Sequence, residues 1–316
     1  MIVITALLAA GFALAVAAPR VLARIDFSAA PRIGMAAWLG AIAAVMGSAV
    51  LVLIALAWQG DPPGERAAKA LARSLAALEP LVITWTAGLI MPVVLIGMIV
   101  PTGQLARIAI GHRGREAALR RRHSELIEIL GRADPAGARL VRLDHPIPLA
   151  YSVAGRGGYV VVTDGLARCL TDAQWRAVLA HENAHLRGFH HHILGACQIL
   201  ARAFGWVPLF TATPAAMATL LELAADRTAA NSTDPQSLYT ALRTVAAHAA
   251  GAPAGRLGLI DADLATRLEC LAAAPESRSA ARCTAAAMLV ATLSLAPLAA
   301  VVAVGSITGL VGLIAA

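Results

Sequence analysis

Four long apolar stretches dominate this chain of 316 residues. A helix needs about 20 apolar residues to cross the hydrocarbon core of a bilayer. The stretches that meet or approach this length are Ile2 to Ala18, Ile33 to Trp58, Leu81 to Pro101 and Ala285 to Ala316. The overall content of hydrophobic residues, 59%, also exceeds that of an ordinary soluble domain. The sequence therefore predicts a mainly α-helical, multi-pass membrane protein with about four transmembrane helices and the lipid bilayer as a partner.

The first apolar stretch is short enough to allow a second interpretation, a cleaved signal peptide. Ala15, Ala17 and Ala18 are small, as a cleavage site requires. However, no Lys or Arg precedes the stretch, and a second apolar stretch follows closely. Both observations favour a retained membrane span.

The segment 102–284 between the third and fourth stretches predicts an inserted α+β domain. Basic residues crowd its start, and two more precede the last apolar stretch: Arg107, Arg113, Arg115, Arg120, Arg121 and Arg122, then Arg278 and Arg282. Loops rich in Lys and Arg stay in the cytoplasm. We therefore expect three transmembrane helices in 1–101, a cytoplasmic domain in 102–284 and a C-terminal transmembrane helix in 285–316, with both termini outside. This distribution explains the net charge of +7 without direct nucleic-acid binding.

Local patterns predict the elements of the inserted domain. We expect a helix near 115–130 and strands at 139–143, 148–153 and 159–163, with the glycine-rich residues 155–158 forming a hairpin turn between the last two. Thr171 and Gln174 fit a capping box that starts the next helix. Before this domain, residues 64–78 read either as an amphipathic helix on the outer surface or as a linker helix. The four cysteines form no C-x-x-C pair and are expected to be reduced and buried.

Residues 181–185 read His-Glu-Asn-Ala-His and fall inside the helix that the capping box starts. Positions i and i+4 lie on one face of a helix, so His181 and His185 can bind one metal ion together. Glu182 is adjacent, where it can act as the general base on the attacking water. The pattern predicts a catalytic metal site.

A later carboxylate is the expected third ligand. Residues 222–226 read Glu-Leu-Ala-Ala-Asp, and Glu222 would complete a three-ligand site for one catalytic Zn²⁺ with an open position. Asp226 lies one turn further along the same helix. We expect it to accept the other N–H of a ligating histidine.

His191 is a rival third ligand. Residues 181–191 also fit H-E-x-x-H-x-x-G-x-x-H, with Gly188 at the turn, which is the metzincin pattern. A run of three histidines makes this match easy by chance, and Met217 alone is poor support for the Met-turn that metzincins need. We therefore favour Glu222.

Two further features bear on substrate binding. The predicted edge strand near Leu149 to Val153 is suited to pairing with an extended peptide backbone. His248 is the only histidine after the motif region, and it is either an oxyanion-stabilising residue or, as we favour, a packed or surface histidine.

The stretch from Ile193 to Leu221 is strongly apolar but carries Arg202, Pro208 and Pro214. One full crossing here would put Glu222 on the opposite side of the membrane from His181. Two crossings need about 40 apolar residues, which are not present. If Glu222 is a ligand, this stretch must lie in the interface or dip into the membrane and return, which holds the site at the membrane surface.

These motifs, set between a third and a fourth span, resemble the BlaR/MecR membrane metallopeptidases. The lead-in from Pro148 through Thr163-Asp164-Gly165-Leu166 is also similar to HtpX-like membrane proteases. The resemblance is strongest from about 145 to 230. It implies a bacterial plasma-membrane protein whose cytoplasmic gluzincin domain cleaves itself and a BlaI-type transcriptional repressor, with His181, His185 and Glu222 as zinc ligands and Glu182 as the catalytic residue.

The BlaR/MecR resemblance is incomplete, and three functions remain open. The best-known members carry a penicillin-binding sensor domain after the last span, whereas this sequence ends at Ala316, so covalent β-lactam sensing is not implied. The alternatives to antibiotic or stress signalling are an HtpX-like quality-control protease and a non-enzymatic metal-binding membrane protein. HtpX-like chains usually place two spans between the histidine motif and the glutamate, for which this chain lacks room. Glu182 argues against pure metal binding, and homo-oligomerisation is left open.

Overall fold

The computed structural model describes residues 2–57, 99–112, 114, 117–118, 131–133, 139–155, 158–249 and 257–273. Several expected elements fall outside these ranges: most of the third span, the whole fourth span, the outer helix at 64–78 and most of the helix at 115–130.

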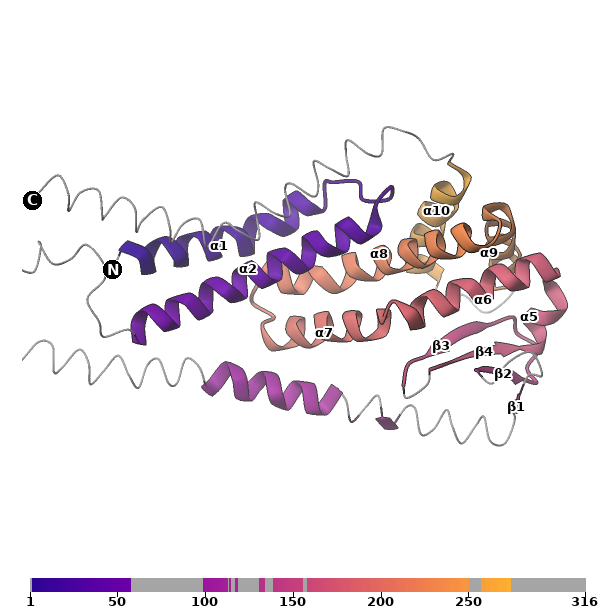
Figure 1. Ribbon diagram of the computed structural model, residues 1–316, viewed down its shortest axis with the longest axis horizontal. Coiled ribbons are helices and arrows are strands. Elements are labelled where there is room, and N and C mark those ends of the chain that lie inside the picture. Colours follow the sequence, from indigo (N-terminus) through magenta and orange to yellow (C-terminus); the bar gives the residue numbers. More distant parts are fainter. Residues whose placement is uncertain are drawn as a thin grey trace, which may run out of the picture.

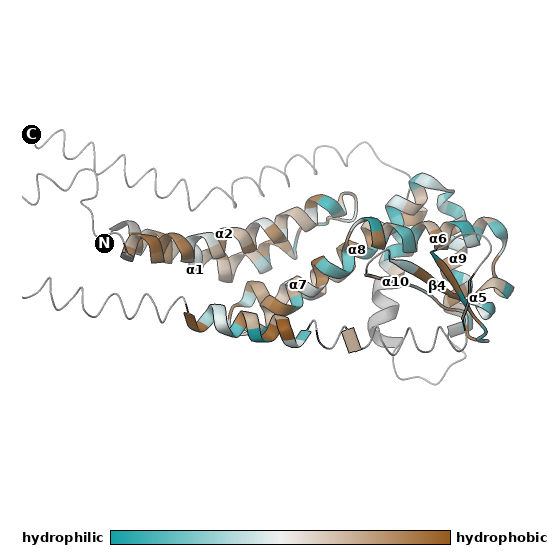
Figure 2. Ribbon diagram, turned by 60° about the horizontal axis from the view of Figure 1, so that its bottom comes forward, coloured by the Kyte–Doolittle hydropathy of each residue, from teal (hydrophilic) through white to brown (hydrophobic). Residues whose placement is uncertain are grey.

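Two long apolar helices form the N-terminal part of the chain. Helix α1 (Ile2–Leu22) and helix α2 (Pro31–Ala57) lie side by side and run in opposite directions (Figure 1). They coincide with the first two predicted spans, and each is long and apolar enough to cross a membrane. Figure 2 shows that hydrophilic residues gather instead at the far end of the molecule, around the sheet and α6. This separation supports a membrane protein with a polar domain at one end.

A small mixed sheet forms part of that polar domain. Its strands are β1 (Gly131–Ala133), β2 (Leu140–Leu143), β3 (Ala150–Val153) and β4 (Tyr159–Thr163), in the order β1-β2-β4-β3. β3 and β4 form the predicted antiparallel hairpin, and β2 pairs with β4 in parallel. The sequence did not predict β1. Because β3 pairs only with β4 within this sheet, it is an edge strand.

Two helices follow the sheet, α5 (Asp164–Cys169) and α6 (Asp172–Arg187). The predicted capping box at the start of α6 is confirmed. The Thr171 hydroxyl accepts from the Gln174 N–H, and the Gln174 side chain accepts from the Thr171 N–H. Such a cap satisfies two of the backbone donors that a helix start leaves without partners.

Helices α7 (His190–Ala203) and α8 (Pro208–Ser232) form a hairpin that goes out from the polar domain and returns to it (Figure 1). One apolar cluster joins the hairpin to α1 and α2; it includes Leu22, Phe27, Trp38, Cys197, Leu209, Phe210 and Met217. The stretch 193–221 therefore returns to the side from which it left, as a site shared by α6 and α8 requires.

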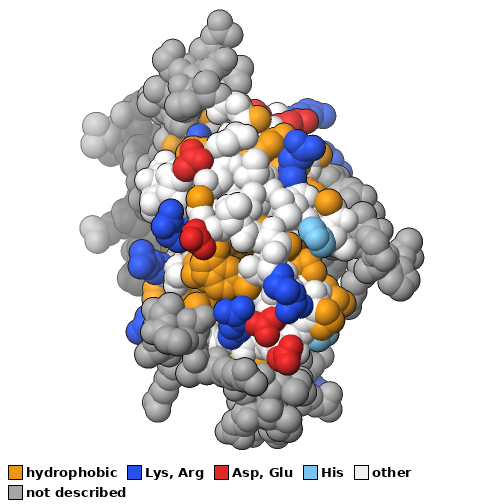
Figure 3. Space-filling view, turned by 90° about the vertical axis from the view of Figure 1, so that its right-hand side faces the viewer, with side chains coloured by type: hydrophobic (Ala, Val, Ile, Leu, Met, Phe, Trp, Pro, Cys, Tyr) orange, Lys and Arg blue, Asp and Glu red, His pale blue; other side chains and the backbone are white. Residues whose placement is uncertain are grey.

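Two C-terminal helices complete the described part, and the sequence did not predict them. Helix α9 (Pro235–Ala249) packs on α6, and α10 (Leu257–Ala272) packs on α8 and α9. Figure 3 looks at the end of the molecule that carries this domain and shows Lys, Arg, Asp, Glu and His side chains interspersed on it. A mixed-charge surface of this kind is suited to water.

Candidate metal centre

The two histidines of the motif lie one turn apart on α6, and both are buried. Their Nε2 atoms face each other at 3.1 Å. This pairing follows from helical geometry, because residues four apart lie on the same face. The spacing of the motif therefore brings two ring nitrogens to one point.

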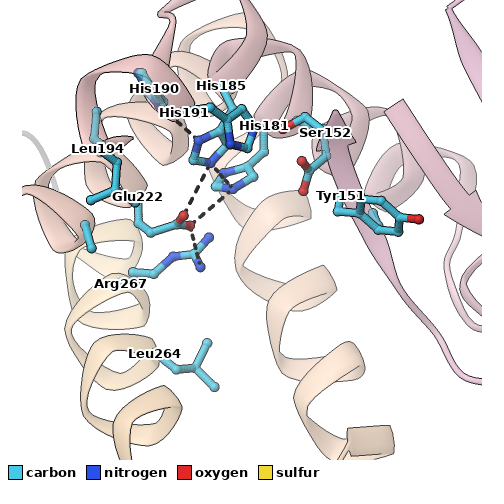
Figure 4. A pocket seen from close by; sticks show the side chains of 14 residues that line it. Tyr151, Ser152, His181, His185, His190, His191, Leu194, Glu222, Leu264 and Arg267 are labelled. Atoms are coloured by element: carbon cyan, nitrogen blue, oxygen red, sulfur yellow. Dashed lines mark hydrogen bonds and ion pairs between the residues drawn. The ribbon is translucent and has the colours of Figure 1, made fainter. Parts of the chain in front are cut away.

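The carboxylate of Glu222, from α8, closes the group. Its Oε2 lies 3.4 Å from His181 Nε2, and its Oε1 lies 3.4 Å from His185 Nε2. Figure 4 shows both rings directed toward this carboxylate. Three ligands bound to one tetrahedral zinc ion at about 2.0–2.1 Å would lie about 3.3 Å apart. The three donor atoms therefore fit a zinc ion, and three protein ligands leave a fourth position for water or substrate.

Asp226 lies behind His181, on the side away from Glu222. Its Oδ1 is 2.8 Å from His181 Nδ1, and its side chain is only 4% exposed. Burial lowers the pKa of His181, but hydrogen bonds to Asp226 and Glu222 outweigh this effect and raise the pKa to about 9. The carboxylate of Asp226 thus fixes the ring so that Nε2 faces the other donors.

Arg267, from α10, connects the two carboxylates of α8, and sequence reasoning missed it. Its Nε and Nη2 each lie 2.7 Å from an oxygen of Asp226, and its Nη1 lies 3.0 Å from Glu222 Oε2. A guanidinium held by a fork of two bonds has a defined orientation. Arg267 therefore ties α10 to α8 and holds Glu222 and Asp226 beside the histidines.

His190 is a second residue to which sequence reasoning assigned no role, and it is buried. Its Nδ1 lies 3.0 Å from Nδ1 of His185. Burial lowers the pKa of His190 to about 4, so the ring is neutral at neutral pH and can accept a hydrogen bond. Burial, with the charge of His181, also lowers the pKa of His185 to about 4, which leaves that ring neutral as a metal ligand must be. His190 therefore orients His185 much as Asp226 orients His181.

The chain reverses between α6 and α7 to bring His190 into place. Phe189 adopts a left-handed conformation with φ 53°. A Cβ atom on Gly188 would lie 2.4 Å from Nε2 of His190, so no other residue fits there without displacing the ring. The turn thus requires glycine at 188 because the His190 ring occupies the space of a side chain.

Glu182 follows His181 on α6 and lines a cavity beside the two histidines. Burial raises the pKa of Glu182, opposed by the charge of His181 and by a hydrogen bond with Ser152 of the edge strand. The Ser152 hydroxyl also lies 3.1 Å from Nε2 of His191. His191 contacts the edge strand and is not a member of the His181, His185 and Glu222 group.

A cavity of about 540 Å³ opens beside this group. The edge strand β3, α6, the start of α7, α8 and α10 line it. His248 does not line it: this exposed residue sits on α9, with its Nδ1 2.8 Å from the carbonyl of Thr244. The placement of His248 matches the surface interpretation rather than a role at an oxyanion.

Residues 114–250 match the family described as Peptidase family M48. No curated protein and no solved structure matches the chain. The matched segment contains the histidine motif, Glu222 and Asp226 but ends before Arg267. The match does not single out the BlaR/MecR type that the sequence resembles. Together with the His/His/Glu group in the structure, it supports a zinc metallopeptidase of the M48 family.

Proposed function

We propose that this protein is a membrane-associated zinc endopeptidase. The observation that carries the proposal is the meeting of three donor atoms at 3.1 to 3.4 Å, from His181, His185 and Glu222, on the wall of an open cavity. A closed structural site would present four protein ligands instead. In this proposal these three residues hold one zinc ion, and Asp226, His190 and Arg267 position them.

The chemistry follows from the groups that face the cavity. When bound, zinc polarises a peptide carbonyl and makes water a better nucleophile at neutral pH. Glu182 accepts the proton of the attacking water and passes it to the nitrogen of the leaving amine. Its raised pKa suits this double role, because a carboxyl group with a pKa closer to neutrality both takes and returns a proton readily.

The edge strand supplies a place for the substrate backbone. Ala150, Tyr151 and Ser152 line the cavity, and β3 has one edge without a partner strand in the sheet of the described residues. An extended peptide can add to such an edge through main-chain hydrogen bonds. We therefore propose that the substrate enters as an unfolded or extended segment lying along β3.

The test separates the proton-transfer role from metal binding. Glu182→Gln in the full-length chain, purified in detergent, should retain zinc but lose cleavage of fluorescein-labelled casein. Glu269→Gln, an exposed glutamate on α10, is the matched control and should cleave at the rate of the unchanged chain. His181→Ala should lose both zinc and cleavage. Undiminished cleavage by Glu182→Gln, or a purified chain that holds no metal, would refute the proposal.

The chain resembles two types of protease, and each resemblance implies a different class of substrate. The resemblance to BlaR/MecR proteins favours a cytoplasmic BlaI-type repressor together with self-cleavage, in antibiotic or stress signalling. The resemblance to HtpX-like proteases favours misfolded membrane proteins, and the M48 match is compatible with both. The Glu182→Gln chain serves as a substrate trap, and proteomics of the proteins that it retains distinguishes a single repressor from a mixture of membrane proteins.

The proposal also includes the orientation of the chain across the plasma membrane of a bacterium. We propose that residues 102–284 face the cytoplasm, between spans in 1–101 and a span in 285–316, with both termini outside. The arginine-rich residues 107–122 support this orientation. Reporter fusions at the termini and within 102–284 test it.

A further inference from the structure

The turn between α7 and α8 presents a large apolar side chain that the described residues do not bury. Trp206 is 82% exposed, and Gly205 and Pro208 beside it are also exposed. The neighbouring Val207, Leu209 and Phe210 are buried against α1 and α2. Soluble surfaces rarely carry tryptophan at this exposure, whereas contact with lipid removes the large apolar ring from water.

The contact between α8 and α2 shows how far along α2 the α7–α8 turn reaches. Leu220 lies against Gly34, where an added Cβ would be 2.9 Å from the Leu220 side chain. The two helices run in opposite directions (Figure 1). Pro208 is twelve residues before Leu220, or about 18 Å along the helix axis. The turn therefore lies level with the region about twelve residues beyond Gly34 on α2, near Met46.

The position of the turn, level with Met46, corresponds to a depth within one leaflet of the bilayer. A hydrocarbon core of about 30 Å takes about 20 residues of α2, which runs to Ala57. If the far boundary lies at Ala57, the near boundary lies about 20 residues earlier, close to Trp38. The turn then lies about 12 Å inside the near boundary and about 16 Å short of the far one. The hairpin enters the membrane without crossing it.

The polar residues near the turn fit this depth. Arg202 is exposed on the last turn of α7, four residues before Trp206. At about 6 Å below the boundary, its long side chain can reach the headgroup phosphates while its stem stays among the acyl chains. At the end of α7, the carbonyl of Ala203 accepts a hydrogen bond from the side-chain amide of Gln104 at 3.0 Å.

We propose that the α7–α8 turn is a lipid anchor that enters only the leaflet on the metal-site side, with Trp206 among the acyl chains and Arg202 at the phosphates. The apolar composition of α8 alone would allow it to cross a membrane, but its register with α2 keeps Glu222 outside the hydrocarbon. By the same arithmetic, Glu222 lies about 9 Å beyond the boundary, at the level of the headgroups. The peptide bond to be cut must therefore come to the membrane surface.

Depth-dependent quenching of Trp206 tests this anchor. The full-length chain and its Trp206→Phe variant are reconstituted in phosphatidylcholine vesicles that carry bromine near the start, middle or end of the acyl chains. The difference between the two emission spectra isolates Trp206. We expect bromine in the acyl chains to remove most of this difference signal, and aqueous iodide to leave it unchanged. Trp175→Phe, a substitution on α6, is the matched control, and its difference signal should resist bromine.

Two outcomes would overturn the anchor. Quenching of the Trp206 signal by iodide but not by brominated lipid would place the turn in water, and a signal that resists both quenchers would place it under protein. Labelling of Gly205→Cys, in a chain without its four native cysteines, by an impermeant maleimide added only on the side opposite the metal centre would show a full crossing. Circular dichroism confirms that each variant keeps its helical content. No cleavage is measured, so the result is independent of whether the chain is a peptidase.

Discussion

Asp226→Asn removes one charge from the group around the metal centre and leaves its shape almost unchanged. Asp226 contacts His181 at 2.8 Å and Arg267 through two bonds of 2.7 Å. Asparagine keeps one oxygen that can accept from the His181 ring. It also leaves the Arg267 guanidinium with Glu222 as its remaining acidic partner among these groups.

The loss of zinc affinity can be worked out from these contacts. A hydrogen bond to a charged group contributes about 1 kcal/mol more than one to a neutral group, which is about fivefold in affinity. Arg267 is then freer to draw Glu222 away from the histidines, which adds to the loss. We expect zinc affinity to fall about 10- to 100-fold, the range for residues that orient a ligand. The cost in folding stability should stay below the about 3–5 kcal/mol of a broken buried ion pair, because Glu222 still binds Arg267.

The measurement is a zinc competition titration against a chromophoric chelator in detergent. Asp172→Asn, an exposed aspartate in the first turn of α6, is the control and should bind zinc as the unchanged chain does. An Asp226→Asn chain with unchanged zinc affinity would show that Asp226 does not orient His181, and the reasoning would fail.

Three further results are expected. His190→Ala should lower zinc affinity about tenfold, because His185 loses the ring that orients it, while exposed His192→Ala should not; the same titration checks both. Gly188→Ala should destabilise the fold by about 1–3 kcal/mol, because its Cβ would overlap the His190 ring, and thermal unfolding compared with Gly155→Ala, where a Cβ meets open space, measures it. Zinc binding should release about one proton at neutral pH, because the metal-free His181 has a pKa of about 9 and must lose its proton to bind. Calorimetry in buffers of different ionisation enthalpy detects this proton, and zinc affinity should rise as the pH rises toward 9. The stability that protonated His181 gives the metal-free chain is complete below pH 6.5 and lost as the pH passes 9; a stability that does not fall in this window would contradict the assignment.

Local sequence patterns predicted the parts of the fold that local interactions determine. The capping box at Thr171 and Gln174 predicted the start of α6, and the glycine-rich residues 155–158 predicted the β3–β4 hairpin. The return of the 193–221 stretch is one of the two paths that a constraint allowed, because Glu222, if it is a ligand, must lie on the same side of a membrane as His181. In each case a short-range rule or a simple count of residues was sufficient.

The groups that position His181, His185 and Glu222 could not be predicted in this way. Arg267 follows Asp226 by 41 residues, and its direction depends on how α9 and α10 fold back on α8. His190 was hidden within a run of three histidines, where the pattern drew attention to His191 instead. The left-handed turn at Phe189 decides which of the three rings faces His185, and a non-glycine residue in that conformation gives no local signal. Tertiary packing, rather than sequence spacing, selected these residues.

The donor atoms are divided between two parts of the protein, and this has a mechanical consequence. The histidines belong to α6, which packs on the sheet, on α9 and on α8, whereas Glu222 belongs to α8, which also packs on α1 and α2. A bound ion would therefore connect the polar domain to the apolar helices α1 and α2 through α8. A slip of α8 by a single residue, about 1.5 Å with a rotation of about 100°, would carry the carboxylate out of reach. A movement of the N-terminal helices that shifts α8 would therefore decide whether one ion can bind Glu222 together with the two histidines.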